Sequence, residues 1–239
     1  MSGPTGSVAP CGPPLPSRML IAREGRPFIL LFGVLALVTV GLAAIVGGWA
    51  AWVVAALSLL LTGFMLFFFR DPPRGGPRAP DLVLAAGDGR VIRVDTVEEP
   101  TYLVGPARRV AVFLSLFDVH VNRYPVGGVV EHRCERPGGY DPAFREAAGE
   151  GNAQLSVGIR TPAGCPVLVR QIAGLIARRI VNYATEGEAV EQGARMGLIR
   201  FGSRVEVFLP LSAEVLVAPG ARSTGGVTVL ARLHGEKVG

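Results

Sequence analysis

The sequence predicts an α+β protein in which a transmembrane helical hairpin precedes a β-rich domain, built as a sandwich or a partly closed barrel. Two observations carry this prediction. Residues 28–47 and 49–69 are apolar runs without a charged residue, each close to the roughly 20 residues that span the hydrocarbon core of a membrane. From residue 81 onward the chain instead has short apolar runs broken by glycine and proline, a pattern typical of strands joined by turns.

The two apolar runs are predicted to form a membrane hairpin that turns at Gly47-Gly48. The turn is uncharged, whereas arginines flank the pair: Arg18, Arg23 and Arg26 before it, and Arg70, Arg74 and Arg78 after it. Because positively charged flanks favour the cytoplasm, we expect both ends, and the β-rich domain, on the cytoplasmic side of the cell membrane. A buried hairpin in a soluble core is the alternative, but such cores seldom stay fully apolar over this length.

Composition also divides the chain into segments. Residues 1–27 are rich in proline and glycine and are expected to form a disordered tail, followed by the hairpin at 28–69 and a linker at 70–80. The remainder, 81–239, is one folded domain. Strands are expected at 83–85, 91–94, 109–114, 167–172, 205–209, 215–220 and 226–231, and a short helix at 142–149; residues 175–183 fit a helix or a strand.

Several classes of function are disfavoured by composition. The formal charge of +5 is not accompanied by aromatic residues interleaved with a basic run, so no nucleic-acid partner is expected. Cys11, Cys134 and Cys165 are scattered, which predicts neither a disulfide framework nor a zinc site, and no metal site is expected. The only lysine, Lys237, lies in the C-terminal tail, so a lysine-bound pyridoxal phosphate or a lysine Schiff base is excluded from the folded domain.

The bond between Gly202 and Ser203 is the first candidate site. Glycine permits backbone angles closed to other residues, so the bond before the serine could sit in a strained turn and be attacked by the serine hydroxyl. Most Gly-Ser pairs, such as Gly6-Ser7, are ordinary turns, and the pair is weak evidence alone.

Two further segments carry polar residues where strands are expected to end. Asp88 lies in a tight glycine turn, which alone is typical of a β-hairpin. The second segment places Asp118, His120, Asn122 and Arg123 within six positions, and histidine is the side chain that titrates near neutral pH.

In combination these segments resemble the phosphatidylserine decarboxylases of the short bacterial and archaeal type, which are pyruvoyl-dependent, self-processing proenzymes. The matching pieces occur in family order from about residue 67 to 210. They are Phe68-Phe-Arg-Asp-Pro72, Ala86-Gly-Asp-Gly89, Phe117-Asp-Val-His-Val-Asn-Arg123, residues 171–180, and Gly197-Leu-Ile-Arg-Phe-Gly-Ser203.

The resemblance implies that the proenzyme cuts itself between Gly202 and Ser203, giving a β chain of residues 1–202 and an α chain of residues 203–239. Ser203 would become a pyruvoyl group, the covalent cofactor, which forms a Schiff base with the amine of phosphatidylserine. Loss of carbon dioxide then gives phosphatidylethanolamine, a step of phospholipid biosynthesis. The implied partners are the lipid in the membrane and the two chains with each other, as a heterodimer that could oligomerise further.

The family's roles carry over by position. Ser203 would be the nucleophile and pyruvoyl source, Gly202 would supply the scissile carbonyl, and His120 would transfer protons. Asp88 matches an aspartate that orients the histidine. Longer relatives have a second histidine where this chain has Arg123, so His120 could serve both maturation and decarboxylation, while Arg123 could bind the carboxylate or phosphate of the substrate.

Two other functions remain open at this stage. A pyruvoyl decarboxylase for a soluble amino acid would not need the membrane hairpin. A membrane-anchored adaptor with a non-enzymatic β domain requires that the Gly202–Ser203 bond stay intact. A serine hydrolase is disfavoured because the chain has no G-x-S-x-G motif.

Overall fold

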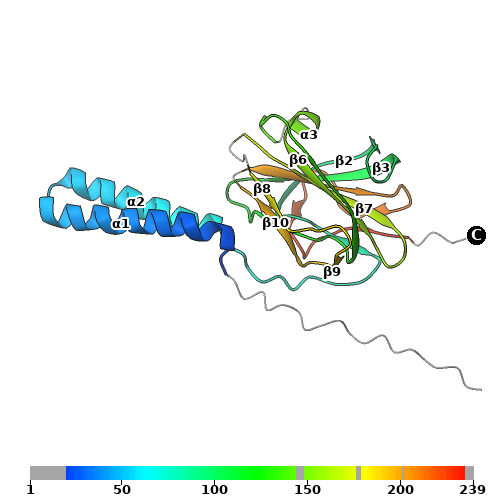
Figure 1. Ribbon diagram of the computed structural model, residues 1–239, viewed down its shortest axis with the longest axis horizontal. Helices are drawn as coiled ribbons and strands as arrows, with labels where there is room; N and C mark the ends of the chain where they lie inside the picture. Colours follow the sequence, from blue (N-terminus) through cyan, green and yellow to red (C-terminus); the bar gives the residue numbers. More distant parts are fainter. Residues whose placement is uncertain (1–19, 144–147, 176–178, 201, 235–239) are drawn as a thin grey trace, which may run out of the picture.

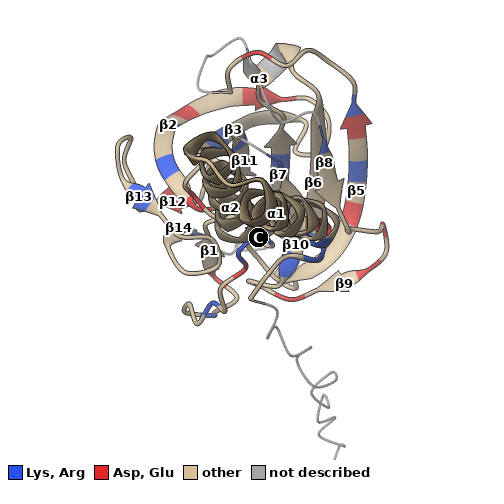
Figure 2. Cartoon of the chain, turned by 90° about the vertical axis from the view of Figure 1, so that its left-hand side faces the viewer, with Lys and Arg blue, Asp and Glu red and all other residues tan. Residues whose placement is uncertain are grey.

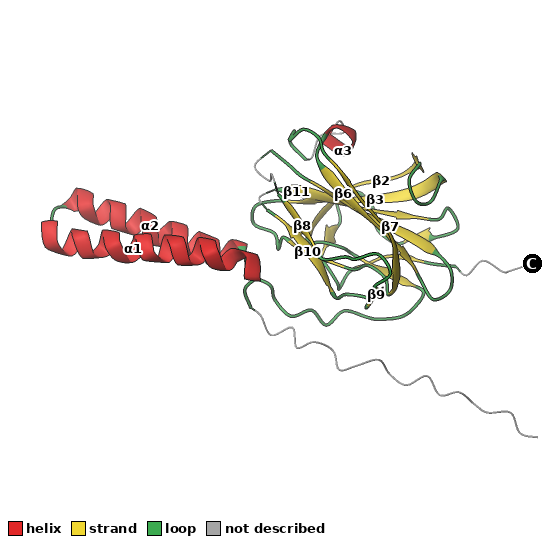
Figure 3. Cartoon of the chain, in the orientation of Figure 1, coloured by secondary structure: helices red, strands yellow, loops and turns green. Residues whose placement is uncertain are grey.

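The computed structural model describes residues 20–143, 148–175, 179–200 and 202–234. Two long N-terminal helices project side by side from one end of a domain composed mostly of strands (Figure 1; Figure 3). The predicted α+β class, with a hairpin of apolar helices before a β-rich domain, is confirmed.

The hairpin consists of α1 (Arg26–Val46) and α2 (Trp49–Phe68), and the short 3-10 helix η1 (Arg23–Gly25) leads into it. The turn between the helices consists of Gly47 and Gly48, whose φ angles of +70° and +82° are readily adopted only by glycine. Both helices are long and apolar enough to cross a membrane and present many of their apolar side chains outward, which indicates membrane association.

The main element of the domain is a strongly curved, eight-stranded sheet, which forms an arc when the molecule is viewed along the hairpin (Figure 2). Neighbouring strands are antiparallel, as expected for strands joined largely by turns. In order across the sheet they are β13 (Arg222–Ser223), β2 (Gly89–Glu99), β3 (Gly105–Leu114), β11 (Ser203–Leu209), β7 (Pro166–Ile172), β6 (Gln154–Arg160), β5 (Gly128–Arg136) and β9 (Ala189–Val190).

Two three-stranded antiparallel sheets complete the domain. One has the order β1 (Leu82–Leu84), β14 (Val229–Arg232) and β12 (Glu214–Val215), and the other β4 (Val121–Arg123), β10 (Arg195–Ile199) and β8 (Ile180–Asn182). The principal core contains residues from all three sheets, so the sheets enclose one apolar interior. A partly closed barrel describes this arrangement.

Strand β11 lies at the centre of the large sheet, between β3 and β7. Val205, Val207 and Leu209 contribute to the core, whereas the alternating Arg204 and Glu206 lie on the other face, as period-two alternation requires. Arg204 and Glu206 are both buried and form an ion pair of 2.5 Å. The strand that begins at Ser203 is thereby fixed on both faces.

The base of the hairpin packs into the domain through a second apolar cluster. Phe68 and Phe69 from the end of the hairpin are fully buried with Val119, Val121 and Leu198 from the domain. The chain before η1 adds backbone hydrogen bonds, from Ala22 N to Phe69 O at 2.7 Å and from Asp71 N to Leu20 O at 2.8 Å. The hairpin is therefore fixed to the domain by a shared core.

Six of the strands expected from the sequence correspond to observed strands, with shifts of a few residues at their ends. The strand expected at 215–220 is wrong over most of its length, because β12 consists of Glu214–Val215 alone. The helix expected at 142–149 is reduced to α3 (Ala148–Gly151) among the described residues, and 144–147 lie outside them. Within the ambiguous segment 175–183, β8 is a strand. Residues 1–19 of the predicted tail, and Lys237, lie outside the described residues. The end of the predicted tail is not disordered: Ile21 forms a β-bridge with Arg70, η1 spans Arg23–Gly25, and α1 begins at Arg26.

Candidate functional site

The Gly202–Ser203 bond lies where the chain enters β11. Gly202 has a φ of +69°, in the left-handed region that favours glycine. Ser203 is fully buried, and its Oγ has no hydrogen-bond partner among the described residues. Burying an unpaired hydroxyl is unfavourable, and such a group in a native fold is a candidate for chemistry.

The carbonyl oxygen of Gly202 is packed against Gly174, just beyond the end of β7. A Cβ atom at position 174 would lie 2.1 Å from this oxygen, so no other residue fits there without a shift of the backbone. Gly174 lies within one of the segments that carry the family resemblance, but sequence reasoning did not single it out. It is needed because β7 and β11 are neighbours at this point.

His120 contacts the residue that precedes the serine. The backbone N–H of Gly202 donates to His120 Nε2 at 3.1 Å, and His120 Nδ1 lies 3.0 Å from the carbonyl oxygen of Asp118. Because a carbonyl only accepts, Nδ1 carries the proton and Nε2 is the unprotonated nitrogen. The structure thus brings together three predicted site residues, His120, Gly202 and Ser203.

The imidazole of His120 is kept neutral by its surroundings. It is fully buried, and the ring of Phe68 at the end of α2 lies 4.3 Å from it between centroids. Burial lowers the pKa of His120 to about 4, because the interior disfavours the charged form more than the nearby Asp118 favours it. At neutral pH the residue is therefore a free base.

Asp118 shapes the loop that presents His120. Its Oδ2 accepts hydrogen bonds from the backbone N–H and the hydroxyl of Ser115, at 2.8 and 2.6 Å, which closes a turn just before the histidine. Its Oδ1 lies 3.3 Å from Arg222 Nη1. Thus the carboxylate of Asp118 stabilises the loop, and its backbone carbonyl fixes the ring of His120.

Asp88 and His120 are not hydrogen-bonded to each other among the described residues. Its carboxylate pairs with Arg74 at 2.7 Å and accepts the backbone N–H of Gly225 at 2.8 Å. Among the described residues, the orientation of His120 is instead set by the Asp118 carbonyl.

Arg123 is paired within the protein. Its guanidinium lies 2.6 Å from Asp71 and donates to the carbonyl oxygens of Pro72 and Gly193, each at 3.3 Å. Burial raises the pKa of Asp71 and lowers that of Arg123, so each charge depends on the other to remain ionised in the interior. Asp71 follows the hairpin directly, and the pair therefore links the hairpin to β4.

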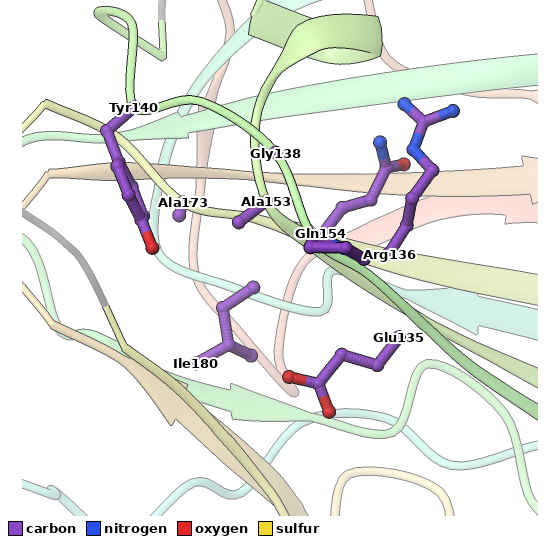
Figure 4. Close-up of a pocket in the computed structure, with 9 residues that line it drawn as sticks. Glu135, Arg136, Gly138, Tyr140, Ala153, Gln154, Ala173 and Ile180 are labelled. Carbon is purple, nitrogen blue, oxygen red and sulfur yellow. The ribbon is translucent and has the colours of Figure 1, made fainter.

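A cavity of about 410 Å³ lies at the ends of β5, β6, β7 and β8 (Figure 4). Its polar lining includes Glu135, Arg136 and Gln154, and Ala173 forms part of its wall. Ala173 precedes Gly174, which contacts the Gly202 carbonyl, whereas His120, Gly202 and Ser203 are not among the lining residues. Within the described ranges, no group of three or more His, Cys, Asp or Glu side chains could hold a metal ion.

Comparison with known proteins gives a consistent result. A family model described as phosphatidylserine decarboxylase matches residues 61–231. Three similar relatives, each named phosphatidylserine decarboxylase proenzyme, come from Symbiobacterium thermophilum, Carboxydothermus hydrogenoformans and Nitrosomonas europaea. They are 47%, 42% and 45% identical to the chain, and the alignments cover 90%, 91% and 90% of it and 97%, 98% and 96% of the relatives.

Proposed function

The chain belongs to the phosphatidylserine decarboxylase family of carboxy-lyases, and from this premise we propose that it is a proenzyme that cuts itself between Gly202 and Ser203. The mature enzyme decarboxylates phosphatidylserine to phosphatidylethanolamine with a pyruvoyl group derived from Ser203. The observation that supports this most is the meeting of a neutral His120, a left-handed Gly202 and a buried, unpaired Ser203 hydroxyl.

Self-cleavage uses only groups of the chain and one water molecule. Ser203 Oγ attacks the carbonyl carbon of Gly202, its proton passes to a base, and the amide becomes an ester while the nitrogen of residue 203 becomes a free amine. Loss of the Cα proton then breaks the Cβ–Oγ bond, and Oγ leaves as part of the Gly202 carboxylate. Water hydrolyses the resulting enamine, through its imine tautomer, to the pyruvoyl ketone and ammonia.

His120 is the base in this proposal. Its Nε2 faces the segment that is cut and is unprotonated at neutral pH, as a general base must be. The packing of Gly174 against the Gly202 carbonyl holds the electrophilic carbon in place.

Ser203 is suited to carry the pyruvoyl group, because it is buried and its Oγ has no hydrogen-bond partner in the described part of the chain. That group supplies a ketone that condenses with the substrate amine and accepts the electrons released with carbon dioxide. A ketone derived from the chain also fits a sequence whose only lysine is Lys237.

Asp88 and Arg123 have supporting roles in this proposal. Asp88 binds Arg74 and the backbone N–H of Gly225, and so stabilises the turn that contains Ala86. The Ala86 carbonyl accepts the N–H of Arg123 on β4, the strand that follows His120. Asp88 thereby orients His120 through β4. A contact of Arg123 with the substrate remains a prediction, and it would require the guanidinium to turn away from Asp71.

The two chains are proposed to remain together as a heterodimer. β11 would belong to the α chain, yet it lies between β3 and β7 of the β chain, and β14 pairs with β1. The arginines that flank the hairpin support a location of the domain on the cytoplasmic side of the cell membrane. The polar cavity beside Ala173 would receive the zwitterionic headgroup.

The proposal is tested by denaturing electrophoresis and intact mass of the protein purified from membranes, beside a Ser203→Ala control. We expect two chains in the wild type, the smaller one beginning at residue 203 with a pyruvoyl group, and decarboxylation of phosphatidylserine in vesicles. A single uncut chain, identical in behaviour to the control, would exclude the enzyme and favour a membrane-anchored adaptor.

A further inference from the structure

Three amide side chains form a hydrogen-bonded row that crosses from β8 through β7 to β4. Asn182 Nδ2 donates to Gln171 Oε1 at 2.7 Å, and Gln171 Nε2 donates to Asn122 Oδ1 at 2.7 Å. Gln171 and Asn122 are fully buried. The family resemblance assigns no role to this amide row.

The orientation of each amide in the row is fixed from its outer end. The backbone N–H of Ala184, which can only donate, lies 2.8 Å from Asn182 Oδ1. Asn182 must therefore present its NH₂ group to Gln171, and Gln171 must present its own to Asn122. As a result Asn122 directs its NH₂ group, not its oxygen, into the interior.

The donor at the inner end of the amide row has no partner. Asn122 Nδ2 is buried and makes no hydrogen bond within the described part of the chain, and the same holds for Ser203 Oγ. Two buried polar atoms without hydrogen bonds destabilise the folded state, unless they bond to each other or to a reacting group.

Asn122, on β4, and Ser203, at the start of β11, belong to different sheets and face the same interior. Ser203 shares a face of β11 with Val205, which is paired in register with Gln171. Ser203 is also paired with Leu114, and a Cβ atom built on Gly87 would lie 3.4 Å from Leu114 and 3.1 Å from Asn122 Nδ2. The register and these contacts therefore bring the unpaired donor and the side chain of residue 203 to the same part of the interior.

We propose that Asn122 Nδ2 donates a hydrogen bond to Ser203 Oγ during self-cleavage, an inference that rests on the proposed cut at Gly202–Ser203. Oγ carries negative charge twice: when it loses its proton and attacks, and when the Cβ–Oγ bond breaks and its electron pair remains on Oγ in the Gly202 carboxylate. A donor positioned in advance in a buried site stabilises both states. Asn122 is thus a catalytic residue of maturation, and the amide row holds its donor in place.

The first test follows self-cleavage of the full-length precursor over time by mass. Asn122→Leu is expected to slow the cut roughly 10- to 100-fold, the effect of losing one hydrogen bond to a charged atom. Hydroxylamine should partly restore cleavage by attacking the accumulated ester, and it leaves an α chain that begins with an intact Ser203 instead of a pyruvoyl group. The two products differ in mass.

The second test leaves Asn122 unchanged. Asn182→Asp keeps an acceptor for Ala184 but offers Gln171 only an acceptor, so Gln171 and then Asn122 must turn over, which presents an oxygen to Ser203. Asn182 is only partly buried, so the aspartate can remain ionised. Asn182→Ala is the matched control, because it removes the outer amide without forcing the others to turn.

We expect Asn182→Asp to cut more slowly than Asn182→Ala, with both variants folded by circular dichroism. Equal rates for these two variants, or wild-type cleavage by Asn122→Leu, would overturn the inference. A wild-type chain that stays uncut with and without hydroxylamine would instead contradict the proposed function, so the two failures are distinguishable.

Discussion

At the scale of single residues, His120 is an imidazole whose protonation the fold opposes. Its pKa is lowered from 6.5 to about 4 by burial, so between these values the unfolded chain binds a proton that the folded chain does not. Stability should therefore fall as the pH drops from 6.5 to 4, by about 3 kcal/mol from this residue.

The measurement is denaturant unfolding of the Ser203→Ala precursor across this pH range, beside the same protein with His120→Gln. Because other groups titrate equally in both proteins, the difference between the two curves reports His120. A difference that does not change with pH would show that the folded state accepts the proton on His120 readily.

Gly174 is expected to be required for self-cleavage. An alanine there would place Cβ 2.1 Å from the Gly202 carbonyl oxygen, displacing the carbonyl that Ser203 is proposed to attack. Misplacement by about 1 Å can slow a reaction about 100-fold, so Gly174→Ala should remain largely uncut. Gly151→Ala is the control, since a Cβ there meets nothing within 4 Å and should cut normally. Equal rates of self-cleavage in both variants would mean that the backbone shifts to accommodate the alanine without slowing the reaction.

At the scale of elements, the junction between hairpin and domain depends on a buried ion pair. The side chains of Arg123 and Asp71 are 7% and 10% exposed, and Arg195 lies 3.5 Å from the same carboxylate. Removing one charge leaves the other buried with weaker partners, Asp71 with Arg195 alone and Arg123 with backbone carbonyls, which is more damaging than removing both. Asp71→Asn and Arg123→Gln should therefore show a coupling of roughly 1–3 kcal/mol in a double-mutant cycle of stability.

The same two variants test whether Arg123 contacts the substrate. If the pair is only structural, the KM of the mature enzyme for phosphatidylserine should change alike in both single variants. A KM that rises in Arg123→Gln and not in Asp71→Asn would show that the guanidinium binds the lipid.

The sequence alone predicted the elements whose signal is local. The two helices follow from uncharged runs of membrane-spanning length, and β11 follows from the alternation after Ser203. Six observed strands were not predicted: β4, β5, β6, β9, β10 and β13. The two-residue strands among them, β9 and β13, are too short to have a periodicity of their own.

Within the candidate site, the sequence did not predict the contacts between segments that are distant in the chain. Gly202, Ser203 and His120 were predicted, largely through the family resemblance, and the structure brings them together. The role of Gly174 depends on the pairing of β7 with β11, and the partner of Asp88 is Arg74 in the linker, 14 positions away. Contacts of this kind depend on strand order, which neither composition nor periodicity encodes.

At the scale of the whole molecule, the hairpin fixes which end of the domain faces the membrane. The hairpin extends over the middle of the arc formed by the large sheet, so the surrounding loops lie at the membrane end (Figure 2). Two large apolar side chains in loops, Phe117 and Leu175, are 71% and 61% exposed. Phe117 is tied to the hairpin base because its carbonyl accepts Arg70 Nη2 at 2.6 Å, and Leu175 follows Gly174 at the cleavage site.

We therefore expect Phe117 and Leu175 to dip into the headgroup region, so that a lipid could reach Ser203 without leaving the bilayer. The only tryptophans, Trp49 and Trp52, lie at the far end of the hairpin and can be replaced by phenylalanine. In that background, Phe117→Trp and Leu175→Trp should be quenched by brominated lipids in proteoliposomes. Leu211→Trp, at the opposite end of β11, should remain unquenched. If all three were equally unquenched, the active end would lie clear of the bilayer, and the lipid would have to be drawn out of the membrane before decarboxylation.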